Sequence, residues 1–221
     1  MSKVLVIGDI ITDKYVYGTT ERLSPEAPVP VVKHLRTEER VGGAGLVYEN
    51  LKGLEVDVEL LDLSSPRCIK TRVICDGHYI TRIDDDHQTV GAWEIIKEKT
   101  FEEYEYVILS DYNKGVLERS LEIIEHLNSF GCKVIVDPKR HSSYYKGAWL
   151  VKPNAKEYKE LEFENWLGNI ITTAAEGSIT AKINGENYSL MPEQVEVNDV
   201  TGAGDCFIAA FVYGLVNNKS H

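Results

Sequence analysis

The sequence predicts an α/β protein with a mostly parallel β-sheet flanked by helices, and a second, small β-sheet beside it. From residue 106 onward, short β-branched runs alternate with a segment of helical periodicity, which is the β-α-β order of parallel sheets. The N-terminal run "KVLVIGD" is continuous and apolar, as expected of a central strand buried on both faces. Two alternating runs joined at Asp76-Gly77 predict a separate hairpin.

The first half of the chain supplies the small sheet and one helix. The segment "SPEAPVPVVKHL" (24–35) carries three prolines, which exclude a helix and favour an extended edge segment. "ERVGGAGLVYENLKGL" (39–54) predicts a glycine turn that opens a helix. We expect the proline-bearing segment and the hairpin to form the small sheet from about residues 12–40 and 66–86, within a single domain of residues 1–221.

The second half predicts the rest of the parallel sheet. "YVILSD" and "CKVIVDPK" are strand patterns on either side of "GVLERSLEIIEHLNSFG", a helix pattern with a terminal glycine, and "AWLVKPN" and "NIITTA" are further strand candidates. Ligands of such sheets bind beyond the carboxyl ends of the strands. The polar residues that follow the predicted strands are Asp9, Asp111, Asp137 and Asn154.

Composition narrows the class of protein. The chain has 221 residues, 43% of them hydrophobic, and a net charge of −11 from 35 acidic and 24 basic residues. This balance argues against a nucleic-acid partner or a membrane-surface partner, since either needs a basic face. No apolar run reaches the roughly eighteen residues of a membrane span, and the N-terminus lacks a signal-peptide cleavage site. The four cysteines form no CxxC pair, which favours buried thiols in a reducing compartment.

The stretch "VNDVTGAGDCFIAAFVYGLV" (197–216) places a carboxylate where a glycine turn meets a helix. Gly202 and Gly204 let successive N–H groups point into one concavity, and the positive end of the helix dipole adds to it. Asp205 could there accept a proton from an incoming hydroxyl while the amides hold a phosphoryl group. The alternative is that Asp205 only caps the helix.

Other polar groups have a plain structural explanation beside a functional one. Asn154 and Glu157 could reach a hydrated magnesium ion, or they could form a capping box. Lys70, Arg72 and Arg82 alternate on the hairpin and could face a substrate phosphate or solvent. The turn "VGGAG" (41–45) allows close approach of the backbone to a ligand, but it matches neither a dinucleotide fingerprint nor a P-loop.

Taken together, the chain resembles the ribokinase-like (PfkB) carbohydrate kinases, most closely the branch that phosphorylates D-glycero-D-manno-heptose 7-phosphate. The motifs occur in the family's order: "GDIITDKYVYGTTERLSPEAPVPVV", "ERVGGAG", "IKTRV", "LSDYNKG", "VIVDPKR", "KPNAKE" and "DVTGAGD". The resemblance implies a three-layer α/β/α fold with a mostly parallel sheet and a small β-sheet lid. It also implies a cytoplasmic enzyme that uses ATP, Mg²⁺ and in some relatives K⁺, with a possible homodimer through the lid.

The resemblance assigns roles position by position. Asp205 matches the catalytic base, and the backbone of Gly202, Ala203 and Gly204 matches the anion hole. Positions that match substrate contacts are Asp13, Gly42, Gly43, Asn50, Lys70, Arg72 and Asp111. Positions that match the nucleotide and magnesium side are Asn154, Glu157, Lys139 and Gly177, with Glu157 reaching Mg²⁺ directly or through water. Asp199 and Thr201 match a monovalent-cation site.

The chain also departs from the family's pattern. Segments between Leu61 and Ser64 and between Phe163 and Asn169 are shorter than in relatives, Leu46 and Ala174 replace an asparagine and a glycine, and sixteen residues follow Asp205. We therefore expect the residues for phosphoryl transfer to match the family's pattern better than the residues of the nucleotide pocket. The sequence favours an ATP-dependent kinase that phosphorylates heptose 7-phosphate at its anomeric hydroxyl. The alternatives are a catalytically weak sugar-phosphate-binding or regulatory protein, or a kinase of the same family for another sugar or nucleoside.

Overall fold

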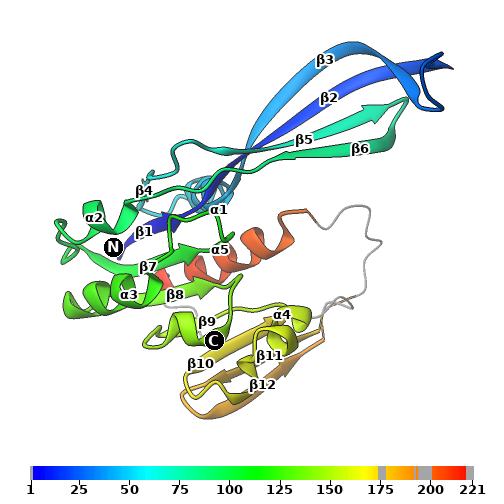
Figure 1. Ribbon diagram of the computed structural model, residues 1–221. Coiled ribbons are helices and arrows are strands. Elements are labelled where there is room, and N and C mark those ends of the chain that lie inside the picture. Colours follow the sequence, from blue (N-terminus) through cyan, green and yellow to red (C-terminus); the bar gives the residue numbers. More distant parts are fainter. Residues whose placement is uncertain (1, 174–177, 192, 194–200, 218–221) are drawn as a thin grey trace.

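The structure, a computed structural model, describes residues 2–173, 178–191, 193 and 201–217. An eight-stranded sheet forms its body, in the order β12-β11-β10-β9-β8-β7-β1-β4, and a four-stranded sheet projects from it (Figure 1). Six neighbouring strands of the large sheet, β4 to β10 in this order, run parallel, and β11 and β12 continue it antiparallel.

The large sheet comprises β1 (Lys3–Gly8), β4 (Val58–Leu61), β7 (Tyr104–Ser110), β8 (Lys133–Asp137), β9 (Leu150–Val151), β10 (Asn169–Thr173), β11 (Ile179–Ile183) and β12 (Glu186–Leu190). The helices are α1 (Ala44–Gly53), α2 (Ala92–Ile96), α3 (Ser120–Ser129), α4 (Ala155–Glu160) and α5 (Ala203–Val216), with 3₁₀ turns η1 (Ser142–Tyr145) and η2 (Phe163–Asn165). Among the described residues, none of these helices has the length and apolarity to cross a membrane.

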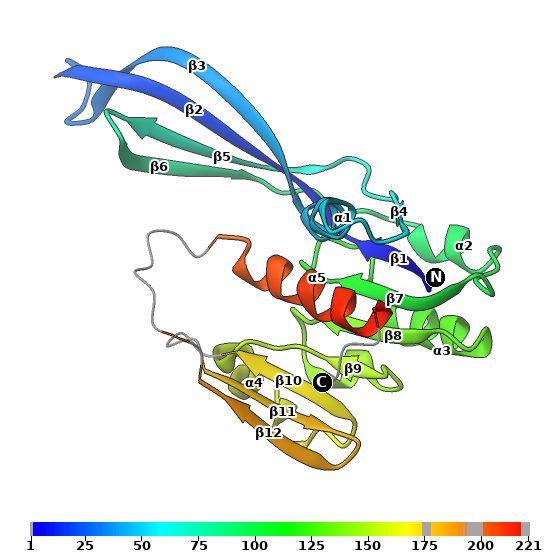
Figure 2. The same cartoon turned by 180° about the vertical axis from the view of Figure 1, so that it is seen from behind.

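Helices cover both faces of the large sheet (Figures 1 and 2). Alternate side chains of β1 separate the two layers, since Val4 and Val6 pack with α1 and α5, whereas Leu5 and Ile7 pack with α2 and α3. This alternation is the period-two pattern of a strand that is buried on both sides. The predicted α/β class with a mostly parallel sheet and a small separate sheet is therefore confirmed.

The four-stranded sheet, called the small sheet below, comprises β2 (Ile10–Leu23), β3 (Pro30–Gly43), β5 (Cys68–Cys75) and β6 (His78–Asp85) in the order β3-β2-β5-β6. The predicted hairpin at Asp76-Gly77 is confirmed, and both residues have positive φ (50° and 80°), as a two-residue hairpin turn requires. The register puts Asp13, Lys70 and Asp84 side by side on one face. That face turns its polar residues toward the body.

Three elements were not predicted from the sequence, and one begins later than predicted. β4, α2 and the β11–β12 hairpin are additional, and the helix expected from residue 115 starts at Ser120. The loop that precedes it is held by a distant side chain, since the Asp9 carboxylate accepts from the N–H of Tyr112 (2.9 Å), Lys114 (3.0 Å) and Val116 (3.0 Å). The expectation of buried thiols holds for three cysteines, but Cys206 is exposed.

Candidate active site

A cavity of about 640 Å³ lies where the carboxyl ends of β7 and β8 meet the N-terminus of α5. This is the edge at which parallel sheets bind ligands. Eight of the predicted site residues line this cavity. The full lining comprises Asp111, Tyr112, Asp137, Pro138, Lys139, Lys152, Asn154, Ala155, Lys156, Glu157, Thr173, Ile179, Gly202, Ala203, Gly204, Asp205 and Phe207.

The α5 N-terminus forms one wall of this cavity. Gly202 is the residue before the first helical turn, with a left-handed φ of 77° that strongly favours glycine. A Cβ on Gly204 would come within 3.0 Å of the Lys152 ammonium. The N-cap of α5 is Gly202, with no side-chain capping hydrogen bond, and Asp205 lies in the first helical turn with 5% of its surface exposed.

The Asp205 carboxylate lies in an environment that makes it a base near neutral pH. Burial and the negative charge of Asp137 raise its pKa to about 6, while a hydrogen bond from Tyr112 and the positive charge of Lys152 act in the opposite direction. The Tyr112 hydroxyl donates to both carboxylate oxygens, at 2.9 and 3.1 Å. A base with a pKa near the working pH is suited to proton transfer.

A buried lysine lies beneath the first turn of α5. The Lys152 ammonium is 3.1 Å from a carboxylate oxygen of Asp137 and 3.5 Å from the Gly204 carbonyl oxygen, and its side chain is 4% exposed. The ammonium of Lys152 therefore lines the cavity beside the first turn of α5, paired with Asp137. Sequence reasoning noted Asp137 at a strand end but missed Lys152.

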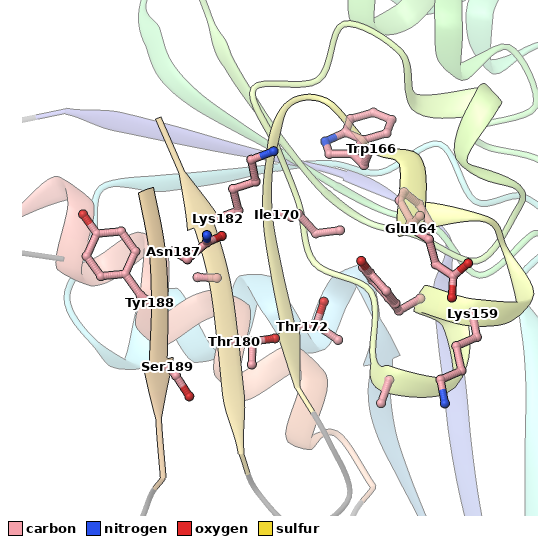
Figure 3. Close-up of a pocket in the computed structure, with 14 residues that line it drawn as sticks. Lys159, Glu164, Trp166, Ile170, Thr172, Thr180, Lys182, Asn187, Tyr188 and Ser189 are labelled. Carbon is pink, nitrogen blue, oxygen red and sulfur yellow. The ribbon is translucent and has the colours of Figure 1, made fainter. Parts of the chain in front are cut away.

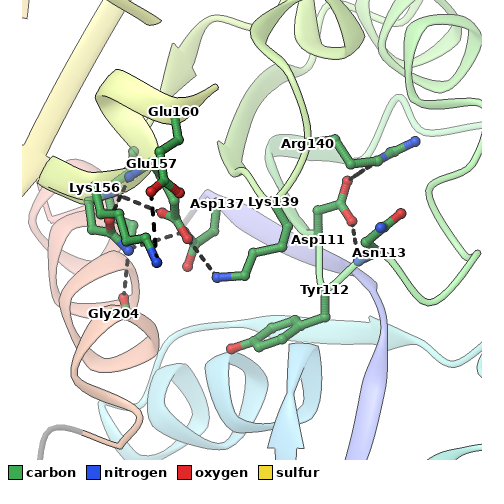
Figure 4. Close-up of polar contacts among 12 residues, drawn as sticks. Asp111, Tyr112, Asn113, Asp137, Lys139, Arg140, Lys156, Glu157, Glu160 and Gly204 are labelled. Atoms are coloured by element: carbon green, nitrogen blue, oxygen red, sulfur yellow. Dashed lines mark hydrogen bonds and ion pairs between the residues drawn. The ribbon is translucent and has the colours of Figure 1, made fainter. Parts of the chain in front are cut away.

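The opposite wall is built by α4. Asn154 and Glu157 form a reciprocal capping box, since the Asn154 side chain accepts from the Glu157 N–H (2.9 Å) and the Glu157 carboxylate accepts from the Asn154 N–H (3.0 Å). Lys139 contacts the second Glu157 oxygen at 2.6 Å (Figure 4). The structural explanation of this motif is therefore correct, and the same carboxylate also lines the cavity.

The small sheet brings further predicted residues to the site. Arg72 and Asp13 form an ion pair between partly buried side chains. Gly42 lies against Asp13, and a Cβ there would overlap the Asp13 carboxylate. The Lys70 ammonium lies 5.6 Å from the centre of the Tyr112 ring, and burial lowers the pKa of Lys70.

Three other predicted residues have well-defined surroundings. Gly43 has a φ of 60° and packs against the Asp9 carbonyl, and Asn50 contacts the Cys206 sulfur at 3.4 Å. Asp111 lines the cavity, but its carboxylate accepts from Arg140 (2.8 Å) and Tyr145 (2.8 Å), with its side chain 1% exposed (Figure 4). This buried network holds the loop after β7.

The cation-site residues can be described only in part. Gly177 and Asp199 lie outside the described residues, as does Ala174, whereas Thr201 is exposed at the start of α5. Within the described ranges, no group of three or more His, Cys, Asp or Glu side chains could hold a metal ion.

A second cavity, of about 690 Å³, lies between α4, η2 and the face of β10–β12 (Figure 3). Thr172 and Thr180 point into it, with Trp166 and Tyr188 at its borders. None of the described predicted site residues is in its lining. We therefore take the cavity with Asp205 as the candidate active site.

Comparison with known proteins shows the family to which the chain is similar. A profile described as pfkB family carbohydrate kinase matches residues 49–221. The bifunctional proteins HldE of Pasteurella multocida and Vibrio cholerae are 30% and 32% identical over 269 and 267 residues, which cover 99% and 98% of this chain. The chain spans 56% of the length of each. The aligned regions are longer than the 221-residue chain, so these relatives carry internal segments that it lacks.

Solved structures show the same fold. A ribokinase from Thermotoga maritima has a TM-score of 0.74 at 16% identity, and covers 100% of this chain and 88% of its own. Phosphofructokinase-2 from Escherichia coli in complex with potassium has a TM-score of 0.73 at 14% identity, with 99% and 87% covered. This likeness confirms the predicted ribokinase-like fold.

Proposed function

Because this chain belongs to the pfkB family of carbohydrate kinases, we propose that it transfers the γ-phosphoryl group of ATP to a phosphorylated sugar. We further propose heptose 7-phosphate as the sugar and its anomeric hydroxyl as the acceptor, which the HldE relatives favour over other sugars. The single observation that carries the proposal is the Asp205 carboxylate, buried beside the N-terminus of α5 with a pKa of about 6.

In this proposal Asp205 accepts the proton of the sugar hydroxyl as the hydroxyl oxygen attacks phosphorus. Gly202, Ala203 and Gly204 supply main-chain N–H groups of the first helical turn, which lack carbonyl partners within a helix and carry its positive dipole end. These donors stabilise the charge that the phosphoryl oxygens carry in the transition state. Lys152, paired with Asp137, lines the same cavity beside these donors.

ATP and Mg²⁺ fit the opposite wall of the cavity. Mg²⁺ in kinases is held by one or two carboxylates, substrate phosphates and water, so the lack of a three-ligand cluster among the described residues does not conflict with it. Glu157 would reach the ion directly or through water, because each of its oxygens accepts one hydrogen bond and keeps a further lone pair. Lys139 and Asn154 would contact the nucleotide phosphates. Bound Mg²⁺ would offset the phosphate charge. We include Thr201 and Asp199 as residues for K⁺.

The small sheet would bind the sugar. Asp13 and Asn50 would contact its hydroxyls, and Gly42 and Gly43 would let the backbone come close to it. Lys70 would hold the sugar's own phosphate. Arg72 would bind the same phosphate with the guanidinium N–H groups that its ion pair with Asp13 leaves unused. Movement of this sheet onto the body would exclude water, which competes with the sugar as acceptor.

The test is ADP formation with a panel of heptose, hexose and pentose sugars, each with and without a phosphate, in buffers with and without potassium. We expect turnover with heptose 7-phosphate and much less with unphosphorylated sugars. Calorimetry with Mg·ATP and with each sugar phosphate separately serves as the second measurement. Sugar binding without nucleotide binding or ADP formation would refute the kinase and favour a sugar-phosphate-binding protein.

We also propose that two copies pair through their small sheets and that the enzyme acts in the cytoplasm, where ATP is abundant. Val41 and Ile83 are exposed apolar side chains of the small sheet (37% and 58%), and β3 and β6 are its edge strands. Exposed edges and apolar faces favour pairing. A monomer by light scattering at micromolar concentration would contradict the dimer.

A further inference from the structure

Tyr112 makes the closest polar contact to the proposed base. Its hydroxyl donates to both oxygens of Asp205, at 2.9 and 3.1 Å, across a sequence separation of 93 residues. Its backbone N–H donates to the Asp9 carboxylate at 2.9 Å, which anchors the residue just beyond the end of β7. The phenol is therefore held from the backbone and aimed at the carboxylate.

The other charged groups near Asp205 come from four places in the fold. Asp137, the last residue of β8, and Asp13 of β2 disfavour a negative charge on Asp205, whereas Lys152, just beyond β9, favours it. The ammonium of Lys70 in β5 lies over the Tyr112 ring, 5.6 Å from its centre. Charges of the small sheet therefore lie close to the pair that Tyr112 and Asp205 form.

We propose that Tyr112 is a positioning residue, which fixes the orientation and the charge state of the Asp205 carboxylate while leaving room for the acceptor hydroxyl. This inference rests on the proposed role of Asp205 as the base. An ionised carboxylate offers about four lone-pair sites, and one hydroxyl donor uses only part of them. The sugar hydroxyl can therefore donate to Asp205 while Tyr112 stays in contact.

The hydroxyl of Tyr112 favours the ionised form of Asp205, because it can only donate to the carboxylate in this arrangement. Burial raises the pKa of Tyr112 itself, so the phenol keeps its proton and remains a donor. A hydrogen bond to a charged group contributes roughly the free energy of one to two pKa units. Without it, burial and Asp137 would raise the pKa of Asp205 further and leave less of the base ionised at neutral pH.

The direct test is a ¹³C NMR titration of the Asp205 carboxyl in the wild-type protein and in Tyr112→Phe, with the resonance assigned by its loss in Asp205→Asn. We expect a pKa of about 6 in the wild type and a value about one to two units higher in Tyr112→Phe. Tyr104→Phe is the matched control, because Tyr104 donates to Glu59 from the opposite end of the same strand. It should leave the titration of Asp205 unchanged.

An unmoved Asp205 pKa in folded Tyr112→Phe would overturn the proposal. If this variant does not fold, 3-fluorotyrosine at position 112 replaces it, since a more acidic phenol is a stronger donor and should lower the Asp205 pKa. An unchanged value there would refute the proposal equally. The titration needs no turnover, so a wild-type protein that forms no ADP would refute the proposed function and leave the test of Tyr112 intact.

Kinetics supply the second readout. In Tyr112→Phe the acidic limb of the pH profile of kcat/KM should move to higher pH by the same one to two units. At pH values above this limb, kcat/KM should recover. The phosphate groups of both substrates also titrate near pH 6, but they are the same for both proteins and cancel in the comparison. A uniform loss of activity at every pH, with the limb in place, would indicate a purely structural tyrosine and contradict the inference.

Discussion

Replacing Asp205 by Asn should stabilise the folded protein at neutral pH, although it removes the proposed base. The pKa of this carboxyl is about 6 in the folded protein, against the ordinary value of 3.8 expected in the unfolded chain. Between these values the folded state binds more protons than the unfolded state, so the stability of the wild-type protein falls as the pH rises through this interval. At pH values above the folded-state pKa, a pKa shift of roughly two units lowers the free energy of unfolding by about 3 kcal/mol.

Denaturant unfolding of both proteins at about pH 4 and about pH 7.5 measures this effect. Because Asn keeps an oxygen that accepts from Tyr112, we expect Asp205→Asn to be about 1–3 kcal/mol more stable at the higher pH and close to wild type at the lower pH. Asp57→Asn removes an exposed carboxylate and should change stability by less than about 0.5 kcal/mol. Equal stability of wild type and Asp205→Asn at both pH values would refute the reasoning about burial.

Two further predictions concern the sugar side of the cavity. Lys70→Met removes a partly buried ammonium. KM for phosphorylated sugars should therefore rise by about 10- to 100-fold, while KM for unphosphorylated analogues stays unchanged. An equal rise for both classes would contradict phosphate binding by Lys70. Gly42→Ala puts a methyl group against the Asp13 carboxylate and should weaken sugar binding in calorimetry by about tenfold or more. Gly53→Ala, whose new Cβ meets open space, is its control and should bind normally.

Local patterns in the sequence were sufficient to predict the main architecture. The continuous apolar strand at the N-terminus, the β-α-β order after residue 106 and the Asp76-Gly77 hairpin each reflect neighbouring residues only, and all three are present in the structure. The same kind of signal at Asn184-Gly185 was overlooked, and these residues turn between β11 and β12 with positive φ. The β11–β12 hairpin was therefore predictable from neighbouring residues alone.

The site depends on contacts that no local pattern contains. The Asp9 carboxylate accepts hydrogen bonds from N–H groups more than a hundred residues away, which hold the loop between β7 and α3. Lys152 looked like part of a strand followed by a helix cap, and only folding brings it to the Gly204 carbonyl. Tyr112 meets Asp205 in the same way. The residues that belong to motifs could therefore be predicted from the sequence. Lys152 and Tyr112, the residues that change the pKa of Asp205, could not.

The claim that Asp205 takes the proton from the sugar hydroxyl is tested most directly by kcat of Asp205→Asn with heptose 7-phosphate and Mg·ATP, after calorimetry has shown that sugar binding is kept. The account predicts a fall in kcat by about 10² to 10⁴ or more. Turnover within a few-fold of the wild type would contradict it.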